Sequence, residues 1–192
     1  PVLRKMEEYA EKTGFPIVGP QVGRLLSIFA RSIGAERILE LGSGYGYSAL
    51  WFALALPQHG RLVCTELSDE NRQRAMQYFE EAGLDAKLSY RIGDGVSTAR
   101  ELTETEPEGY DIVFNDVDKE DYPQVPELAA ALLRPGGLFI TDNTLWYGKV
   151  IDQKPDSVTQ GIREFNEQTV HHPQFETSIL PIRDGLTVAV RR

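Results

Sequence analysis

The segment Leu39-Glu40-Leu41-Gly42-Ser43-Gly44-Tyr45-Gly46-Tyr47-Ser48 runs from an apolar stretch through a glycine turn into a helical pattern. Glycines let a ligand approach the backbone closely, and the start of the following helix favours an anionic group. The turn is not a phosphate loop, because the terminal Gly-Lys-Ser/Thr is missing, and Tyr47 replaces the last glycine of the full dinucleotide fingerprint. Taken alone, it also fits a tight turn that binds no ligand.

Short apolar runs alternate with helical patterns from this turn onward. We expect strands at 37–41, 61–66, 87–92, 111–116 and 138–142, with helices at 47–56, 69–82, 95–105 and 122–133 between them. Ser68 is expected to cap the second of these helices, and Gly83 and 134–137 are expected to act as stop signals. This alternation predicts an α/β fold with a Rossmann-like, doubly wound parallel sheet.

Both ends of the chain depart from the alternation. Residues 1–34 carry two helical patterns around 14–20, and the second has an apolar stripe suited to packing against the sheet or a partner subunit. After residue 142, an aromatic and polar loop precedes a helix at about 158–170 and two strands near 175–182 and 186–191, which a short turn would join as a hairpin. We find no repeat or linker, so residues 1–192 are expected to form a single domain.

Composition narrows the classes of function. The net charge is −9, with 20 basic and 29 acidic residues, which disfavours nonspecific binding to nucleic acid and favours a small-molecule substrate. No apolar run approaches the ~20 residues of a membrane span, and the given chain begins at Pro1 without a basic-then-apolar leader, so we expect a cytoplasmic protein without membrane contact. Cys64 is the only cysteine, which excludes an internal disulfide and favours a buried structural thiol.

Acidic residues follow two of the expected strands, in Asn115-Asp116-Val117-Asp118-Lys119 and Thr141-Asp142-Asn143. Open α/β sheets bind ligands at the carboxyl ends of their strands. Asp116, Asp142 and Asn143 offer hard oxygen ligands that suit Mg²⁺ or another divalent cation such as Mn²⁺ or Ca²⁺. Lys119 beside such a cation would have its pKa lowered enough to act as a base. The alternative is an acidic strand edge with a solvated lysine.

Other polar residues fit an adenosine-containing cofactor. Glu66 ends the second strand, 22 residues beyond Gly44, where a carboxylate can accept both ribose hydroxyls. Asp94 and Gly95 follow the third strand and either border an adenine ring or form an ordinary capped turn. Trp146 and Tyr147 either wall a pocket for a flat ring or pack in the core or an interface. His171 and His172 are expected at a helix C-terminus and not at a metal.

With these motifs in order, the chain resembles the cation-dependent class I O-methyltransferases that use S-adenosylmethionine, the group that includes catechol and caffeoyl-coenzyme A O-methyltransferases. The match runs from about Phe15 to Arg192. Its most specific parts are Leu39-Glu40-Leu41-Gly42 with Gly46-Tyr47-Ser48, Asp116-Val117-Asp118-Lys119, Asp142-Asn143-Thr144-Leu145-Trp146 and Asp184-Gly185-Leu186-Thr187-Val188. Departures are Val117 in place of alanine, Asn115 in place of an apolar residue, and a shorter N-terminal region than the family usually carries.

The resemblance implies a seven-stranded sheet with an antiparallel last strand, a homodimer, and roles for the candidate residues. Cofactor contacts fall on Gly42 and Ser48 near the methionine part, Glu66 on the ribose, and Asp94 and Gly95 beside adenine. Glu40 supports the turn, and Asp116 lies beside the cofactor as well as among the metal ligands. The metal ligands are Asp116, Asp142 and Asn143, and the base is Lys119.

The expected reaction is transfer of a methyl group from S-adenosylmethionine to one of two adjacent hydroxyls on an aromatic small molecule. A second possibility is methylation of a hydroxylated uridine in transfer RNA, which a basic strip of Arg4, Lys5, Arg24 and Arg31 on the pocket rim would support. A noncatalytic module that binds S-adenosylmethionine would leave Lys119 and the three oxygen ligands unexplained. A nicotinamide-dependent dehydrogenase would need the full glycine fingerprint.

Overall fold

The computed structural model describes residues 1–192. The strands are β1 (Arg37–Leu41), β2 (Arg61–Glu66), β3 (Leu88–Ile92), β4 (Tyr110–Asn115), β5 (Leu133–Thr141), β6 (Phe175–Leu180) and β7 (Leu186–Arg191). The α-helices are α1 (Val2–Thr13), α2 (Gly19–Ser32), α3 (Tyr47–Ala53), α4 (Asp69–Glu81), α5 (Gly95–Thr105), α6 (Val125–Leu132) and α7 (Ser157–His171). Short 3₁₀ helices are η1 (Asp85–Lys87), η2 (Lys119–Gln124) and η3 (Trp146–Ile151). None of the helices combines the length and apolar character that crossing a membrane requires.

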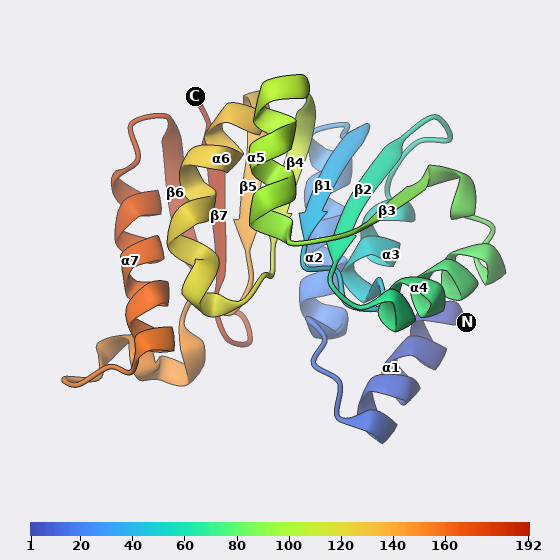
Figure 1. The fold of residues 1–192 in the computed structure, drawn as a ribbon, viewed down its shortest axis with the longest axis horizontal. Coiled ribbons are helices and arrows are strands. Elements are labelled where there is room, and N and C mark those ends of the chain that lie inside the picture. The colour runs from blue at the N-terminus through green and yellow to red at the C-terminus, as the bar shows by residue number, and fades with distance from the viewer.

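All seven strands form one sheet in the order β3-β2-β1-β4-β5-β7-β6 (Figure 1). Strands β1 to β5 pair in parallel, while β7 is antiparallel to both β5 and β6. The doubly wound sheet with an antiparallel last strand is therefore confirmed. The hairpin between β6 and β7 turns at residues 183–185, as the sequence predicted.

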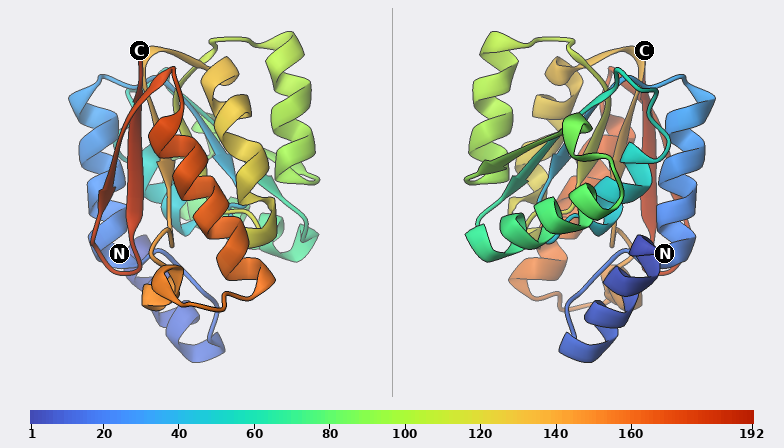
Figure 2. Two further views of the ribbon diagram at one scale, coloured as in Figure 1. Left: turned by 90° about the vertical axis from the view of Figure 1, so that its left-hand side faces the viewer. Right: turned by 90° about the vertical axis from the view of Figure 1, so that its right-hand side faces the viewer.

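Helices cover both faces of the sheet, as Figures 1 and 2 show: α2, α3 and α4 on one face and α5, α6 and α7 on the other. Inward-facing strand residues alternate between the two hydrophobic cores, so Ile38 and Ile112 pack toward α2 and α3 while Leu39 and Val113 pack toward α5 and α6. Cys64 is fully buried in the first core, in agreement with a structural thiol. Helix α1 lies below the sheet, beyond the carboxyl ends of the strands.

Side-chain caps begin three of the helices. Ser68 accepts a hydrogen bond from the Asn71 amide at the start of α4, as predicted, and Asp94 and Asp156 do the same at the starts of α5 and α7. These caps satisfy backbone donors that the first turn of a helix leaves free. The cap at Asp94 therefore supports one of the two interpretations that the sequence left open for this residue.

Two boundaries differ from the predictions because of proline and glycine. Strand β5 begins at Leu133, five residues earlier than expected, and the predicted stop 134–137 lies within it. The pairing of β4 with β5 shifts register between Tyr110 and Ile112, which accommodates the extra residues. The expected helix 122–133 is a 3₁₀ turn, η2, followed by α6, because Pro123 and Pro126 fall at its start.

The register of β1, β4 and β5 aligns the carboxyl ends of three neighbouring strands. Leu41 pairs with Asn115, and Asn115 pairs with Thr141. From these positions the chain continues into the glycine turn after β1, into Asp116 after β4 and into Asp142 after β5. These three segments therefore emerge side by side at the point where the strand order reverses, which is the ligand-binding edge of such sheets.

Gly42 is the tightest point of this arrangement. Its φ is +80°, and a Cβ at this position would lie 2.5 Å from the carbonyl oxygen of Asp116. Gly34 has a similar φ of +61° with nothing within 4 Å of its would-be Cβ. We expect Gly42→Ala to lower the free energy of unfolding by about 2 kcal/mol or more, and Gly34→Ala by only about 1 kcal/mol, since the second variant carries backbone strain alone. Urea unfolding of both variants measures the difference, and equal losses would contradict the close contact.

Candidate active site

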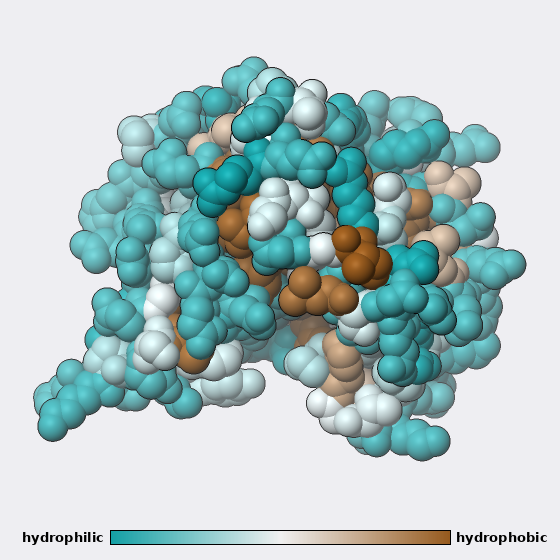
Figure 3. All heavy atoms as spheres, viewed as in Figure 1, coloured by the Kyte–Doolittle hydropathy of each residue, from teal (hydrophilic) through white to brown (hydrophobic).

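A cavity of about 1080 Å³ opens at the carboxyl ends of the strands. It is visible in Figure 3 as a hollow at the lower edge of the molecule. The structure brings nearly all the predicted site residues to its wall: Gly42, Ser48, Glu66, Asp94, Gly95, Asp116, Lys119, Asp142 and Asn143. Glu40 is the exception, because it lies fully buried behind the glycine turn.

Glu66 organises the glycine turn. One carboxylate oxygen accepts from the Gly44 amide at 2.9 Å, and the other accepts from the Ser68 amide and from Asn71 Nδ2. The Thr65 hydroxyl accepts from the Gly42 amide at 3.1 Å, and Tyr90 donates to the Gly44 carbonyl. The carboxylate at the end of β2 is therefore fixed against the turn, where the sequence placed a ribose-binding acid. Thr65 and Tyr90 were missed because neither belongs to a recognised motif.

Glu40 and Ser48 form a buried pair beneath the turn. Ser48 donates its hydroxyl hydrogen to Glu40 Oε1, while Oε2 has no protein partner. Burial, together with the nearby charge of Asp116, raises the pKa of Glu40 to about 8 although the Ser48 hydrogen bond opposes this shift. Glu40 is thus largely protonated at neutral pH and stands as a neutral support for the turn.

Gly95 lies at a point of the cavity wall that has little room for a side chain. A Cβ there would lie 3.0 Å from Val117 Cγ1 and 3.1 Å from the Thr65 hydroxyl. Asp94 precedes it with its Oδ1 engaged by the Ser97 amide at 2.7 Å. Asp94 and Gly95 therefore form a capped turn that also borders the cavity, so the two interpretations of this segment are compatible.

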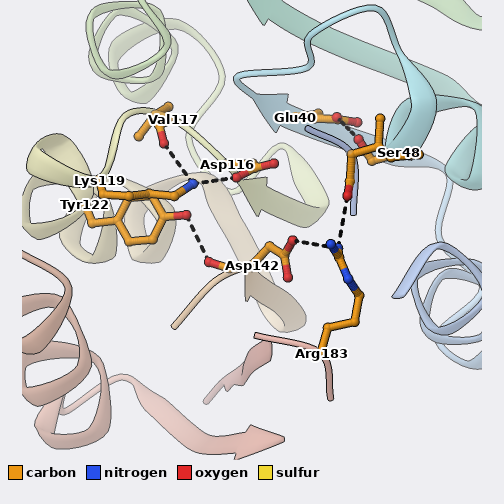
Figure 4. Close-up of polar contacts among 9 residues, drawn as sticks. Glu40, Ser48, Asp116, Val117, Lys119, Tyr122, Asp142 and Arg183 are labelled. Atoms are coloured by element: carbon orange, nitrogen blue, oxygen red, sulfur yellow. Dashed lines mark hydrogen bonds and ion pairs between the residues drawn. The ribbon is translucent and has the colours of Figure 1, made fainter. Parts of the chain in front are cut away.

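Asp116 and Lys119 form an ion pair at the end of β4. Lys119 Nζ donates to Asp116 Oδ1 at 2.8 Å and lies 4.9 Å from the centre of the Tyr122 ring (Figure 4). The side chain of Lys119 is only 14% exposed. Desolvation by burial raises the pKa of Asp116, although Lys119 opposes this shift. The lysine is held in the site, which contradicts the alternative of a solvated lysine at a strand edge.

Asp142 has an uncompensated oxygen inside the site. The residue is 2% exposed, and its Oδ1 has no hydrogen-bond donor. Burial and then the negative charge of Asp116 raise the pKa of the Asp142 carboxyl. Tyr122 donates to the backbone carbonyl of Asp142 at 2.9 Å, which holds the residue at the end of β5. Asn143 follows in the left-handed region, with a φ of +58°, and lines the same cavity.

This donor set fits a hard divalent cation. Two carboxylates and an amide supply oxygen atoms only, and the orphaned Asp142 Oδ1 is a buried acceptor in need of a positive partner. With two carboxylates and no histidine or cysteine, the set does not suit zinc. His172 lies elsewhere, buried with its Nε2 3.2 Å from Glu127 Oε1, and His171 ends α7 as predicted.

Residues from distant parts of the chain complete the cavity. Arg183, in the β6–β7 turn, places Nη1 3.8 Å from Asp142 Oδ2. Asp184 beside it accepts from the Tyr147 amide and so holds the loop that carries Trp146 and Tyr147 against the cavity. The sequence predicted a turn at 183–185 and a family motif that begins at Asp184, but it gave Arg183 no role. The only available signal was the presence of a long cationic side chain in a turn where small or polar residues are usual.

The raised pKa of Glu40 predicts a pH-dependent stability. Between about pH 4.5 and 8 the folded protein keeps a proton on Glu40 that the unfolded chain loses, so the free energy of unfolding falls as pH rises through this window, by an amount on the order of a few kcal/mol. Glu40→Gln should remove this component. Urea unfolding at pH 5.5 and 8.5 measures it, with the exposed Glu70→Gln as control. The same pH dependence in Glu40→Gln and wild type would contradict the assignment.

Comparison with known proteins agrees with this geometry. The O-methyltransferase family profile matches residues 2–192. The catechol O-methyltransferase of Niastella koreensis is 33% identical over 179 residues, which cover 90% of this chain and 81% of that protein.

Solved structures extend the agreement to the fold. The O-methyltransferase from Bacillus cereus in complex with SAH aligns with a TM-score of 0.90 at 31% identity, covering 100% of this chain and 90% of that one. TomG from Streptomyces achromogenes, an O-methyltransferase involved in tomaymycin synthesis and solved in complex with SAM, gives a TM-score of 0.89 at 32% identity over 99% and 89% of the two chains. The chain therefore belongs to the O-methyltransferase family and is an enzyme that uses S-adenosylmethionine.

Proposed function

We propose that the enzyme transfers the methyl group to one hydroxyl of a vicinal diol on a small aromatic molecule, with the help of a divalent cation. The observation that carries this proposal is the convergence of Asp116, the uncompensated Asp142 and the enclosed Lys119 beside the glycine turn. Two adjacent hydroxyls can bind a cation together, which a single alcohol cannot do. The name of the Niastella koreensis relative, a catechol O-methyltransferase, supports the same class of acceptor.

Residues on the cavity wall would hold S-adenosylmethionine, which supplies the methyl group when it is bound. Glu66 would accept the ribose hydroxyls, Asp94 and Gly95 would border adenine, and Gly42 and Ser48 would contact the methionine part. Asp116 lies beside this region as well as among the candidate metal ligands. Glu40 would act indirectly. It accepts a hydrogen bond from the Ser48 hydroxyl and so fixes that hydroxyl, and Ser48 lines the cavity.

Asp116, Asp142 and Asn143 would hold the cation, which lowers the pKa of the diol hydroxyls and orients them when it is bound. The protein holds the backbone of Asp116 and Asp142 rigidly in place. Asp142 is anchored through its carbonyl by Tyr122, and the Asp116 amide donates to the Leu41 carbonyl at 2.9 Å. The oxygen ligands are therefore tied to the cofactor turn through the sheet, and a diol bound at them would be positioned relative to the cofactor.

Lys119 in its neutral form, which the positive charge of a cation bound beside it would favour, would take the proton from the reacting hydroxyl. Its amine is held by Asp116 Oδ1 and lies over the face of Tyr122, so it is enclosed and pointed into the site instead of toward solvent. A positioned base of this kind contributes roughly 10²- to 10⁴-fold to a rate. Asp116 would then stabilise the resulting ammonium group.

Charges on the cavity wall favour a small acceptor over RNA. Seven acidic side chains line the cavity in addition to the candidate metal ligands: Glu7, Glu11, Glu66, Asp94, Asp118, Glu120 and Asp121. The basic strip that would have supported an RNA acceptor, Arg4, Lys5, Arg24 and Arg31, is absent from the wall. Arg4 and Lys5 pair instead with Glu8 and Glu81.

The decisive experiment measures methyl transfer from labelled S-adenosylmethionine to catechols, caffeoyl esters and hydroxyuridine RNA, each with Mg²⁺ and with a chelator. We expect transfer to the vicinal diols only, and loss of that transfer in chelator. Transfer that is insensitive to chelator, or that occurs only to RNA, would contradict the proposal.

Removing a candidate metal ligand should abolish cation binding. Asp142→Asn keeps the size of the side chain but loses its charge, so we expect Mg²⁺ to raise the melting temperature of the wild type and not of the variant. Asp118→Asn, an exposed carboxylate on the same wall, is the matched control and should respond like the wild type. A variant Asp142→Asn that binds Mg²⁺ normally would remove Asp142 from the ligand set.

Replacing the candidate base should affect chemistry more than binding. We expect Lys119→Met to lower kcat by about 10²-fold or more while the KM for the diol changes little. Lys149→Met removes a lysine from the neighbouring loop, outside the cavity, and serves as control. Single-turnover kinetics at saturating Mg²⁺ measure the effect, and an unchanged chemical rate in Lys119→Met would exclude this role.

A further inference from the structure

Arg183 occupies a backbone position that suits glycine better. Its φ is +50°, in the left-handed region, where a residue with a side chain costs about 1 to 2 kcal/mol. Gly185, two residues later in the same turn, has a φ of +88° and meets this requirement without strain. Nothing in the hairpin itself requires a long cationic side chain at residue 183. The strain points to a role for this side chain outside the turn.

The Arg183 side chain reaches from the β6–β7 turn toward Asp142 (Figure 4). Nη1 donates to the Ile17 carbonyl at 3.0 Å and lies 3.8 Å from Asp142 Oδ2, which is beyond hydrogen-bond distance. The other oxygen of Asp142, Oδ1, is buried and has no hydrogen-bond partner in the protein. Arg183 and a cation at the candidate metal site would therefore face different oxygens of one carboxylate, so the two are compatible.

Most of the donors of Arg183 are free. A guanidinium carries five N–H groups in a planar fork, and the structure gives Arg183 a single hydrogen bond, to Ile17. The side chain lines the cavity and is 37% exposed. Several N–H groups are thus available to a ligand that enters the cavity.

Arg183 is one of only two cationic side chains that line the cavity. The acidic lining residues come from α1, from the last residue of β2 and from the segments that follow β3, β4 and β5. The only other cationic lining residue, Lys119, follows β4. Arg183 is the one lining residue that the β6–β7 turn contributes. An acceptor bound at Asp142 that extends toward this turn therefore meets one cationic fork.

We propose that Arg183 is a specificity-determining residue that binds a carboxylate substituent of the methyl acceptor. This inference rests on the proposed function, because the diol fixes the acceptor at the end of β5. Planar guanidinium and planar carboxylate pair through two parallel hydrogen bonds. A single negative charge fits better than a phosphate or a coenzyme A ester, since the remaining wall is acidic and would repel a polyanion.

Three acceptors that differ in one substituent test the proposal: 3,4-dihydroxybenzoate, the neutral 3,4-dihydroxybenzaldehyde and the cationic 3,4-dihydroxybenzylamine. We expect the wild type to prefer the benzoate over the amine in kcat/KM. Arg183→Gln should lower kcat/KM for the benzoate about tenfold or more, mainly through KM, and change the aldehyde by less than about threefold. Arg183→Lys should restore part of the loss, because it keeps the charge without the fork.

A binding measurement separates recognition from chemistry. Calorimetric titration of 3,4-dihydroxybenzoate into the protein with S-adenosylhomocysteine and Mg²⁺ should show an about tenfold higher Kd for Arg183→Gln and an unchanged Kd for Lys149→Gln, the control that removes a cation outside the cavity. Melting temperatures establish that all variants fold. Arg183→Gly provides a second test, since it relieves the backbone strain and should lose the benzoate preference without losing stability.

Two outcomes would overturn the proposal. If Arg183→Gln lowers kcat/KM equally for all three acceptors, the arginine serves only to hold Ile17. If the wild type prefers the amine over the benzoate, Arg183 does not bind an anionic substituent. Turnover of the aldehyde identifies these as failures of the specificity proposal alone. If the wild type methylates none of the three diols, the proposed function has failed and the inference falls with it.

Discussion

The active-site region depends on the alignment of three parallel strand ends. Because Leu41, Asn115 and Thr141 lie in register across the sheet, the glycine turn and the two aspartates leave the sheet at the same level. The glycine turn and the end of β4 lie so close together that Gly42 has no space for a Cβ against the backbone of Asp116. The glycine turn and the candidate metal site are therefore parts of one rigid edge, and neither can move without disturbing the sheet.

Electrostatics at this edge are unfavourable for the protein alone. Asp116 and Asp142 raise each other's energy in a poorly solvated place, and the two nearby cations compensate them incompletely, with Lys119 bonded to one and Arg183 3.8 Å from the other. Glu40, buried next to them, avoids a third charge by keeping its proton. A site of this kind gains free energy from bound positive charge, which agrees with the positively charged methyl donor that the family uses.

The N-terminal helices are built onto the same edge. Tyr45 in the glycine turn donates to the Met6 carbonyl, Tyr47 donates to Glu7, and Phe15 packs edge-on against Tyr45 at 4.9 Å between ring centres. On the other side of the cavity, Arg183 in the β6–β7 turn donates a hydrogen bond to the Ile17 carbonyl and so links that turn to the N-terminal region. Residues from 7 to 20 thus contribute to the wall of the cavity. The apolar stripe of α2 packs into the core through Val22 and Leu26, which is one of the two roles that the sequence left open.

The sequence by itself determined the strand and helix order, the glycine turn and the strand-end acids, since periodicity and strand-end chemistry are local properties. It misplaced the start of β5, because a proline-glycine stretch can either end an element or form an irregular strand, and pairing with β4 decides between them. Only the tertiary structure could bring Arg183 to Asp142 across 41 residues of chain, or Tyr122 beneath the same residue. Contacts of this kind depend on how the hairpin and α7 pack on the sheet, and no local pattern encodes the distance between two side chains.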